Sequence, residues 1–232
     1  MGGSWPFLQV WRNAMTSDDN PDNPLEIRLR QGEAAAMAEL FARHRPRLWR
    51  MVHFRLSRQL HGRVDADDVL QEAYLAAARR IEHYAKGGFT SAFLWLRVVV
   101  QQTLVDVHRR HLGAAKRDAG REVALYGHYP QATSASLAIQ LVGDWTSPSQ
   151  AAARGELLDR VQAAIASMNP LDQEILALRH FEELTNAEAA QSLGIEPKAA
   201  SIRYVRALQR LKDVLAAFPG LFEGPQDGRA AE

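Results

Sequence analysis

The chain has 232 residues, of which 47% are hydrophobic and 24% are charged, and its formal net charge is +1. This length allows two small domains with separate cores, and the balanced charge requires any basic nucleic-acid-binding surface to be offset by acidic surfaces elsewhere. The absence of cysteine excludes disulfides and thiolate metal sites, and no apolar run reaches the roughly 18 residues of a membrane span. We therefore expect a soluble, cytoplasmic protein with no direct membrane insertion.

Residues 1–24 have no apolar period and contain a polar cluster, so they are predicted to form a mobile N-terminal extension. The sequence changes at Leu25, where helix formers begin to dominate and apolar residues recur at helical spacing. Gly32 is predicted to separate a short helix from a longer one, and Pro46 is expected to bend or break the longer helix. Strand signals are almost absent from the chain, which indicates an all-α fold.

A helix is predicted over residues 63–80, with two faces of opposite character. Its buried stripe would consist of Val69, Leu70, Ala73, Tyr74, Ala77 and Ile81. The opposite side would carry Asp65, Asp68, Glu72, Leu75 and Arg79, with Gln71 beside them. Spacing alone leaves two interpretations open. The carboxylates could serve a solvated helix start, where they favour the positive end of the helix dipole, or the stripe could bind a partner.

The next predicted helix begins near Ser91, and its C-terminal part is dense in arginine and lysine up to Arg121. One face carries Trp95, Gln102 and Arg109, and interleaved aromatic, amide and cationic side chains suit single-stranded or partly opened nucleic acid. For Trp95 alone, burial in the core of a small domain is the more common alternative.

Residues 122–146 have no sustained apolar period and are predicted to be a flexible linker with at most one short helix. Ser147 and Pro148 cap a long helix that should reach about Met168, and Asn169 and Pro170 start another. Residues 219–232, rich in glycine and charge, are predicted to form a disordered tail.

Residues 184–215 have the pattern of a helix-turn-helix. Thr185 and Glu188 form a capping box at the start of a short helix. Gly194 supplies the left-handed conformation of a tight turn, and Pro197 fits the first turn of the next helix. The pattern predicts that the second helix lies in the major groove of DNA.

This second helix also divides into two faces. The core face would contain Ala200, Tyr204, Ala207, Leu208, Leu211, Leu215 and Phe218. The other face carries Lys198, Ser201, Ile202, Arg203, Val205, Arg206, Gln209 and Arg210. A solvated face has little use for Ile202 and Val205, whereas apolar side chains in the major groove can contact thymine methyl groups.

Signatures of enzymatic chemistry are missing from the sequence. It has no glycine-lysine dipeptide of a phosphate-binding loop, no dinucleotide-binding glycine triad and no nucleophile elbow. His108 and His111 lie one helical turn apart, but no zincin motif accompanies them. We expect neither an enzyme nor a cofactor or a metal site.

Three segments in order carry a resemblance to a known family: DADDVLQEAYL at residues 65–75, FLWLRVVVQQTLVDVHRRH at residues 93–111, and residues 170–212 with the helix-turn-helix. Together they resemble bacterial sigma factors of the sigma-70 superfamily, and specifically the extracytoplasmic-function group, which keeps only the second and fourth conserved regions. The resemblance implies a factor that binds core RNA polymerase and directs promoter recognition, DNA opening and transcription initiation. Residues 25–121 would be region 2, and residues 147–218 would be region 4.

The resemblance also implies roles for particular residues. The helix of residues 63–80 would bind core RNA polymerase through Asp68, Gln71 and Glu72. The following helix would recognise the minus-ten element through Gln102, Arg109 and Arg110. The helix-turn-helix would recognise the minus-thirty-five element through Lys198, Ser201, Ile202, Arg203 and Arg206. The resemblance leaves room for an anti-sigma factor as a further partner.

Gln102 stands where members of this family commonly have asparagine, so their minus-ten sequence preference does not transfer to this chain. The alternative to a sigma factor is a helix-turn-helix transcription regulator that is not a polymerase subunit and binds a palindromic duplex by itself. A helical metal protein that uses His108 and His111 is a third hypothesis.

Overall fold

The computed structural model describes residues 23–60, 62–86, 89, 91–112, 130–143 and 151–218. These residues form helices and connecting turns without a strand, which confirms the all-α prediction. They divide into two compact units. Unit 1 contains the described residues up to Leu112 and the segment Phe181–Glu188, and unit 2 contains the others. Residues 1–22 of the predicted N-terminal extension, the predicted tail, the basic residues 113–121 and parts of the predicted linker lie outside the described residues. Asn23 and Pro24, the last two residues of that extension, instead form the start of the first helix, because the Asn23 side chain caps it.

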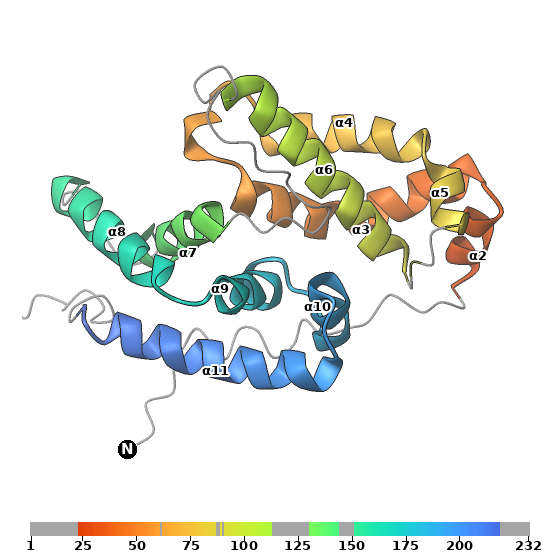
Figure 1. Ribbon diagram of the computed structural model, residues 1–232. Coiled ribbons are helices and arrows are strands. Elements are labelled where there is room, and N and C mark those ends of the chain that lie inside the picture. Colours follow the sequence, from red (N-terminus) through yellow and green to blue (C-terminus); the bar gives the residue numbers. More distant parts are fainter. Residues whose placement is uncertain are drawn as a thin grey trace, which may run out of the picture. The chain divides into compact units, whose positions relative to one another are not determined.

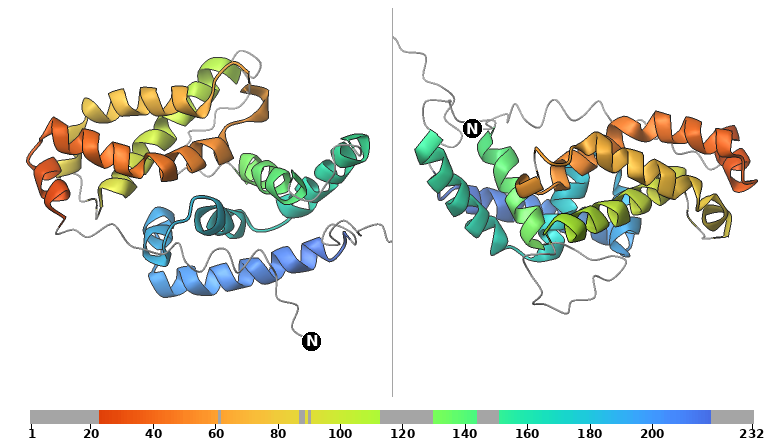
Figure 2. Two further views of the ribbon diagram at one scale, coloured as in Figure 1. Left: turned by 180° about the vertical axis from the view of Figure 1, so that it is seen from behind. Right: turned by 90° about the horizontal axis from the view of Figure 1, so that it is seen from above.

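Unit 1 is built on three long helices. These helices are α3 (Ala34–Arg55), α4 (Ala66–Ala78) and α6 (Ala92–Leu112). They pack against one another in pairs, as Figure 1 and the two views of Figure 2 show. The short helices α2 (Pro24–Arg30) and α5 (Ile81–Lys86) pack together, and a 3₁₀ turn, Arg58–Leu60, follows α3.

Gly32 has a φ of +85° between α2 and α3, which confirms the predicted separation of these two helices. Pro46 was expected to bend or break the longer helix; it lies inside α3 without ending it, so the helix is not broken there. Tertiary packing on both sides explains the continuity: Phe41 and Leu48, which flank the proline, are both buried. This packing offsets the hydrogen bond that a proline removes from a helix.

A buried carboxylate joins three helices of unit 1. Glu26 of α2 is 1% exposed and accepts hydrogen bonds from the Tyr84 hydroxyl of α5, at 2.5 Å, and from the Ala92 amide of α6, at 2.8 Å. The Ala92 amide belongs to the first turn of α6, where helix amides have no partner within the helix. Glu26 therefore acts as a cap for α6 from a distant part of the chain.

The segment Phe181–Glu188 brings a second buried carboxylate into unit 1. Glu182, 1% exposed, lies 2.5 Å from a guanidinium nitrogen of Arg55 and 2.7 Å from one of Arg97. Burial alone would raise the pKa of Glu182, but the two arginines together lower that pKa below its ordinary value. Phe181 stacks on Phe54 with ring centroids 4.7 Å apart.

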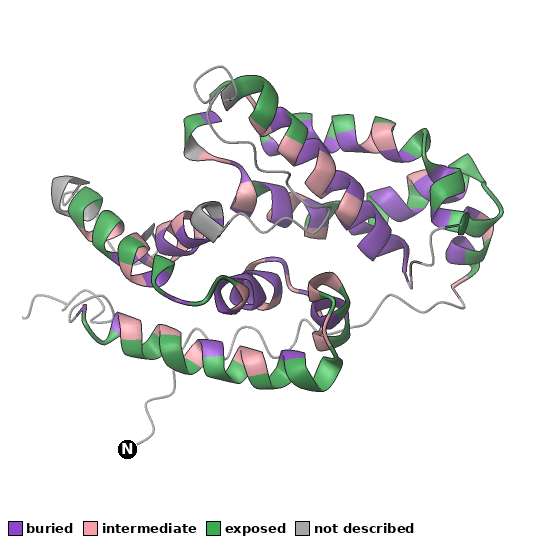
Figure 3. Cartoon of the chain, in the orientation of Figure 1, coloured by how far each residue is buried: buried purple, intermediate pink, exposed green. Residues whose placement is uncertain are grey.

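Unit 2 contains α7 (Pro130–Gly143), α8 (Ala151–Ala166) and α9 (Pro170–Leu176), which continues into a π-helical turn, Ala177–Phe181. Helix α10 (Asn186–Leu193) and helix α11 (Pro197–Leu215) follow. Helix α11 packs on α9 and α8, and α7 packs on α8 and α9. The buried faces of α9 and α11 are visible in Figure 3.

Helix α7 lies within residues 122–146, which the sequence predicted to be a linker with room for one short helix, and it belongs to unit 2. Its contacts explain why no apolar period revealed it. Two of its buried residues are polar, Thr133 and Ser134, and the Thr133 hydroxyl donates to a carboxylate oxygen of Glu174 in α9, at 3.2 Å. A helix that is buried through small and polar residues has only a weak hydrophobic signal.

Candidate functional site

Helix α4 begins with a capping box. The Asp65 carboxylate accepts from the Asp68 amide at 2.8 Å, and the Asp68 carboxylate accepts from the Asp65 amide at 3.0 Å. Both carboxylates thus serve the helix start, as one of the two sequence interpretations proposed. The predicted buried stripe is confirmed, except that Tyr74 is only half-buried.

The outer side of α4 carries four exposed residues, here called the α4 surface: Asp68, Gln71, Glu72 and Leu75. Leu75 is 48% exposed, although it is a large apolar side chain. Capping accounts for Asp68, but it accounts neither for an exposed leucine nor for the acidic and amide side chains of the next turn. An apolar side chain ringed by polar ones is typical of a protein-binding surface.

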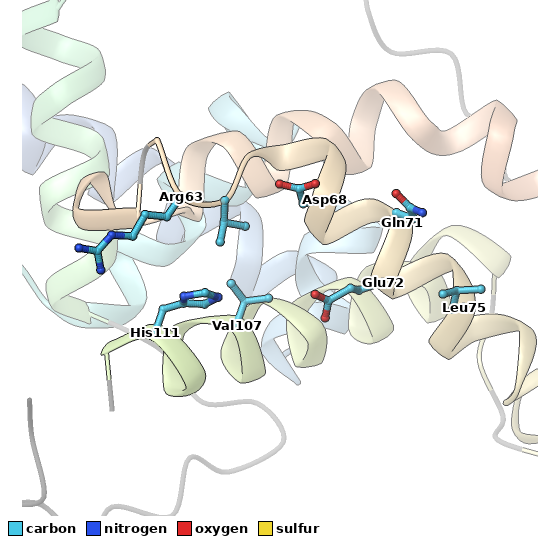
Figure 4. A pocket seen from close by; sticks show the side chains of 8 residues that line it. Arg63, Asp68, Gln71, Glu72, Leu75, Val107 and His111 are labelled. Carbon is cyan, nitrogen blue, oxygen red and sulfur yellow. The ribbon is translucent and has the colours of Figure 1, made fainter. Parts of the chain in front are cut away.

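All four residues of the α4 surface line one pocket of about 350 Å³. Its other lining residues are Arg63, Val64, Val107 and His111, so the pocket lies between the start of α4 and the C-terminal half of α6. Figure 4 shows these side chains around it. The structure therefore brings together the three residues that the resemblance assigned to polymerase binding and adds Leu75 to them.

The three predicted minus-ten residues lie along the C-terminal half of α6 and are all at least partly accessible. Two of them have partners in unit 1: Arg110 donates to Glu72 of the α4 surface at 2.5 Å, and Gln102 accepts from Arg80 at 2.7 Å. Arg109 is exposed. Two predicted functions thus meet in one exposed ion pair, because Glu72 was assigned to polymerase and Arg110 to DNA.

Trp95 is 2% exposed and lies against Tyr84, with ring centroids 5.3 Å apart. It is a core residue, as the alternative interpretation of this tryptophan held. His108 also faces inward in part, since its Nε2 accepts from the Ser57 amide at 3.2 Å and burial lowers the pKa of its imidazole. No group of three metal-ligating side chains occurs among the residues that the structure describes.

The helix-turn-helix is confirmed in its details. The Thr185 amide donates to the Glu188 carboxylate at 2.5 Å, and the Glu188 amide donates to the Thr185 hydroxyl at 3.2 Å. Gly194 has a φ of +64°, and the Ile195 amide closes the turn by donating to the Ala190 carbonyl at 3.0 Å. The turn therefore has the left-handed glycine that the sequence predicted.

The outer face of α11 is exposed at the predicted positions. Its apolar members, Ile202 and Val205, are 45% and 64% exposed. Around them lie the exposed residues Lys198, Ser201 and Arg206. Within the described part of the chain, Lys198 and Arg206 make no ion pair, so their charges are available to a ligand.

Arg203 lies differently from the other predicted minus-thirty-five residues. One of its guanidinium nitrogens is 2.9 Å from Oδ1 of Asp172 in α9, and Arg210 pairs with Oδ2 of the same carboxylate. Asp172 itself is 1% exposed. Sequence reasoning missed Asp172, because its only local signal is an acidic residue in the first turn of α9.

A second polar contact lies under α11. The His180 ring has its Nε2 2.8 Å from the Tyr204 hydroxyl, and the Arg179 guanidinium lies over the Tyr204 ring at 5.4 Å. Burial first, and then the charge of Arg179, lowers the pKa of His180 to about 4. Burial raises the pKa of Tyr204, although Arg179 opposes this shift. Polar pairs as well as apolar packing therefore hold α11 to the helices beneath it.

A helical unit with an acidic, partly apolar surface, together with a helix-turn-helix whose outer face is basic and apolar, is typical of DNA-binding proteins that also bind another protein. None of the helices in the described residues is both long enough and apolar enough to span a membrane.

Comparisons with known proteins identify the family. The family model for Sigma-70 region 2 matches residues 40–112, and the one for Sigma-70, region 4, matches residues 158–211. The chain is 32% identical over 190 residues to the RNA polymerase sigma factor CarQ of Myxococcus xanthus, covering 81% of this chain and 94% of CarQ. It is 29% identical to the ECF RNA polymerase sigma factor SigD of Mycobacterium tuberculosis, covering 80% of each chain.

A solved structure, titled "Structure of CnrH in complex with the cytosolic domain of CnrY", matches with a TM-score of 0.49 and 22% identity, covering 86% of this chain and 99% of that chain. On the family matches and the similarity to CarQ, the chain belongs to the sigma-70 family of RNA polymerase sigma factors, and relatives such as SigD are named as ECF factors. It binds core RNA polymerase and promoter DNA and directs transcription initiation.

Proposed function

We propose that this sigma factor divides its work among three surfaces: the α4 surface binds core RNA polymerase, the C-terminal half of α6 contacts the minus-ten element, and the outer face of α11 reads the minus-thirty-five element. The observation that carries the proposal is the α4 surface, whose polar residues and exposed Leu75 surround one pocket. Such a surface suits a partner that offers basic side chains around an apolar one.

In this proposal, polymerase binding depends on Asp68, Gln71 and Glu72, with Leu75, one helical turn after Gln71 and Glu72, as the apolar contact. The acidic charges would speed association with a basic partner, and Leu75 would provide buried area. Since Glu72 also pairs with Arg110, polymerase binding at Glu72 would release the Arg110 guanidinium for DNA.

Promoter opening is assigned to Gln102, Arg109 and Arg110 on α6. Their accessible positions support this assignment. Guanidinium groups can hold phosphates and stack on unpaired bases, which offsets the few kcal/mol that each unstacking step costs.

Recognition of the minus-thirty-five element is assigned to Lys198, Ser201, Ile202 and Arg206 on α11. Lys198 and Arg206 at phosphates would position the helix, while the Ser201 hydroxyl and the apolar Ile202 side chain would contact base edges and thymine methyl groups. Arg203, which the resemblance placed in this set, pairs with buried Asp172.

The direct test of the α4 surface is an affinity measurement with purified core RNA polymerase. The variant Asp68→Asn, Glu72→Gln, Leu75→Ala removes two charges and the apolar contact, while its amides still accept the hydrogen bonds of the capping box and of Arg110. We expect at least a tenfold loss of affinity. The control is Glu82→Gln on α5, an exposed carboxylate away from the α4 surface, which should bind as the wild type does.

An affinity of the triple variant equal to that of Glu82→Gln would contradict the assignment of the α4 surface. An anti-sigma factor that covers the same surface would compete with core polymerase. Titrating such a protein into the wild-type complex would then release polymerase, and the triple variant would also bind the competitor more weakly.

A further inference from the structure

The two arginines that pair with Asp172 lie on one side of α11, seven residues apart. Seven residues are almost two full helical turns, so Arg203 and Arg210 project from the same stripe. Each takes one oxygen of the carboxylate: Arg203 lies 2.9 Å from Oδ1, and Arg210 pairs with Oδ2. One aspartate of α9 thus joins two successive parts of the helix that carries the DNA-reading face.

Because the Asp172 carboxylate is buried, it depends on its two arginine partners. The Asp172 side chain is 2% exposed, whereas the side chains of Arg203 and Arg210 are 33% and 55% exposed. An ionised carboxylate without water must keep its cationic partners, because removing them leaves an uncompensated buried charge. A phosphate that recruited these guanidinium groups would therefore have to offset the loss to Asp172.

Other cations of α11 are not held by a buried carboxylate in the described part of the chain. Arg206 is exposed, and among the described residues it has no ion-pair partner. Helix α11 thus carries two classes of arginine: one committed to the protein, and one available to DNA.

We propose that Asp172 is a positioning residue that holds Arg203 and Arg210 off the DNA phosphates, so that these two arginines fix α11 on unit 2 and do not add nonspecific phosphate contacts. This proposal rests on the function assigned to α11 above. With two of its cations withheld, α11 depends more on base contacts and less on sequence-independent charge.

The test is the salt dependence of promoter binding by holoenzyme reconstituted from core polymerase and the full chain, followed by fluorescence anisotropy of a labelled promoter duplex. Each phosphate contact contributes about 0.9 to the magnitude of the slope of log K against log salt concentration. We expect Arg206→Gln to lower the slope by about this amount and Arg210→Gln to leave it unchanged. Arg210→Gln keeps the Arg203 pair with Asp172, so folding should be preserved.

Asp172→Asn should change the salt dependence in the opposite direction. Releasing both guanidinium groups should raise the magnitude of the slope by up to about 2 and increase affinity for a duplex with a scrambled minus-thirty-five element, which loss of structure would not do. If Arg210→Gln lowers the slope as much as Arg206→Gln does, the proposal is overturned. If neither arginine affects the slope, the assignment of α11 to DNA fails instead.

Discussion

Glu26 shows how much of unit 1 depends on a single side chain. Replacing it with alanine leaves the buried Tyr84 hydroxyl and the Ala92 amide without their acceptor. We expect Glu26→Ala to lower the free energy of unfolding by about 2–6 kcal/mol, since each of the two unsatisfied buried donors costs roughly 1–3 kcal/mol. Urea unfolding followed by circular dichroism would measure the loss.

The matched control for this substitution is Glu33→Ala. Glu33 forms an exposed pair with Arg28 at 2.8 Å, and such pairs contribute at most about 1 kcal/mol. Equal losses from the two variants would show that the buried acceptor has no special role.

The His180 imidazole makes the stability of unit 2 depend on pH. Its pKa of about 4 lies below the ordinary histidine value of 6.5, so between these pH values the unfolded chain binds a proton that the folded chain does not. Stability is therefore full above pH 6.5 and falls by up to about 3 kcal/mol as the pH drops towards 4. NMR titration of the imidazole checks the pKa directly. In His180→Gln the stability difference between pH 6.5 and pH 4 should be smaller by this amount.

Residues on helix surfaces were predictable from sequence, and buried polar partners were not. The exposed positions of Asp68, Glu72 and Arg206 follow from a period of 3.6 residues. Asp172 and Glu182, in contrast, are buried because distant arginines neutralise them, and no local pattern contains that information. The same limit applies to Arg203: its helical position predicts an outward-facing side chain, but no local pattern predicts that its guanidinium pairs with Asp172.

The helix-turn-helix depends on one backbone conformation. At Gly194, with φ of +64°, an added Cβ would meet no atom within 4 Å, so only the left-handed conformation opposes a side chain there. We expect Gly194→Ala to destabilise unit 2 by about 1 kcal/mol. At Gly155, inside α8, an added Cβ also has no atom within 4 Å, but the backbone there is helical and so accepts alanine.

Gly155→Ala should therefore stabilise the same unit by up to about 1 kcal/mol. Thermal unfolding of Gly194→Ala and Gly155→Ala tests both expectations. Changes in melting temperature of the same sign would contradict this account of the turn.

Elements with local signals were predicted well, and elements made by tertiary contacts were not. A few neighbouring residues determine the capping boxes of α4 and α10 and the turn at Gly194. Helix α7 and the uninterrupted α3 depend instead on contacts with other helices. Because such packing acts across the sequence, neither could be inferred from a window of the chain.

Across the whole molecule, a net charge of only +1 conceals separate acidic and basic surfaces. The α4 surface carries exposed carboxylates, which we propose bind a protein partner, whereas α11 carries exposed cations and apolar side chains, which we propose contact DNA. In this account the two units contribute different functions to one initiation factor, and each function can be removed without the other.

Run-off transcription tests this account most directly. The purified chain, core RNA polymerase and a pool of upstream DNA fragments should yield discrete transcripts, whose start sites align to reveal the promoter. We expect the transcripts to vanish when Asp68, Gln71 and Glu72 are all replaced by lysine, and to persist with Glu82→Lys. Transcripts that survive the triple replacement would contradict the claim that the α4 surface binds polymerase.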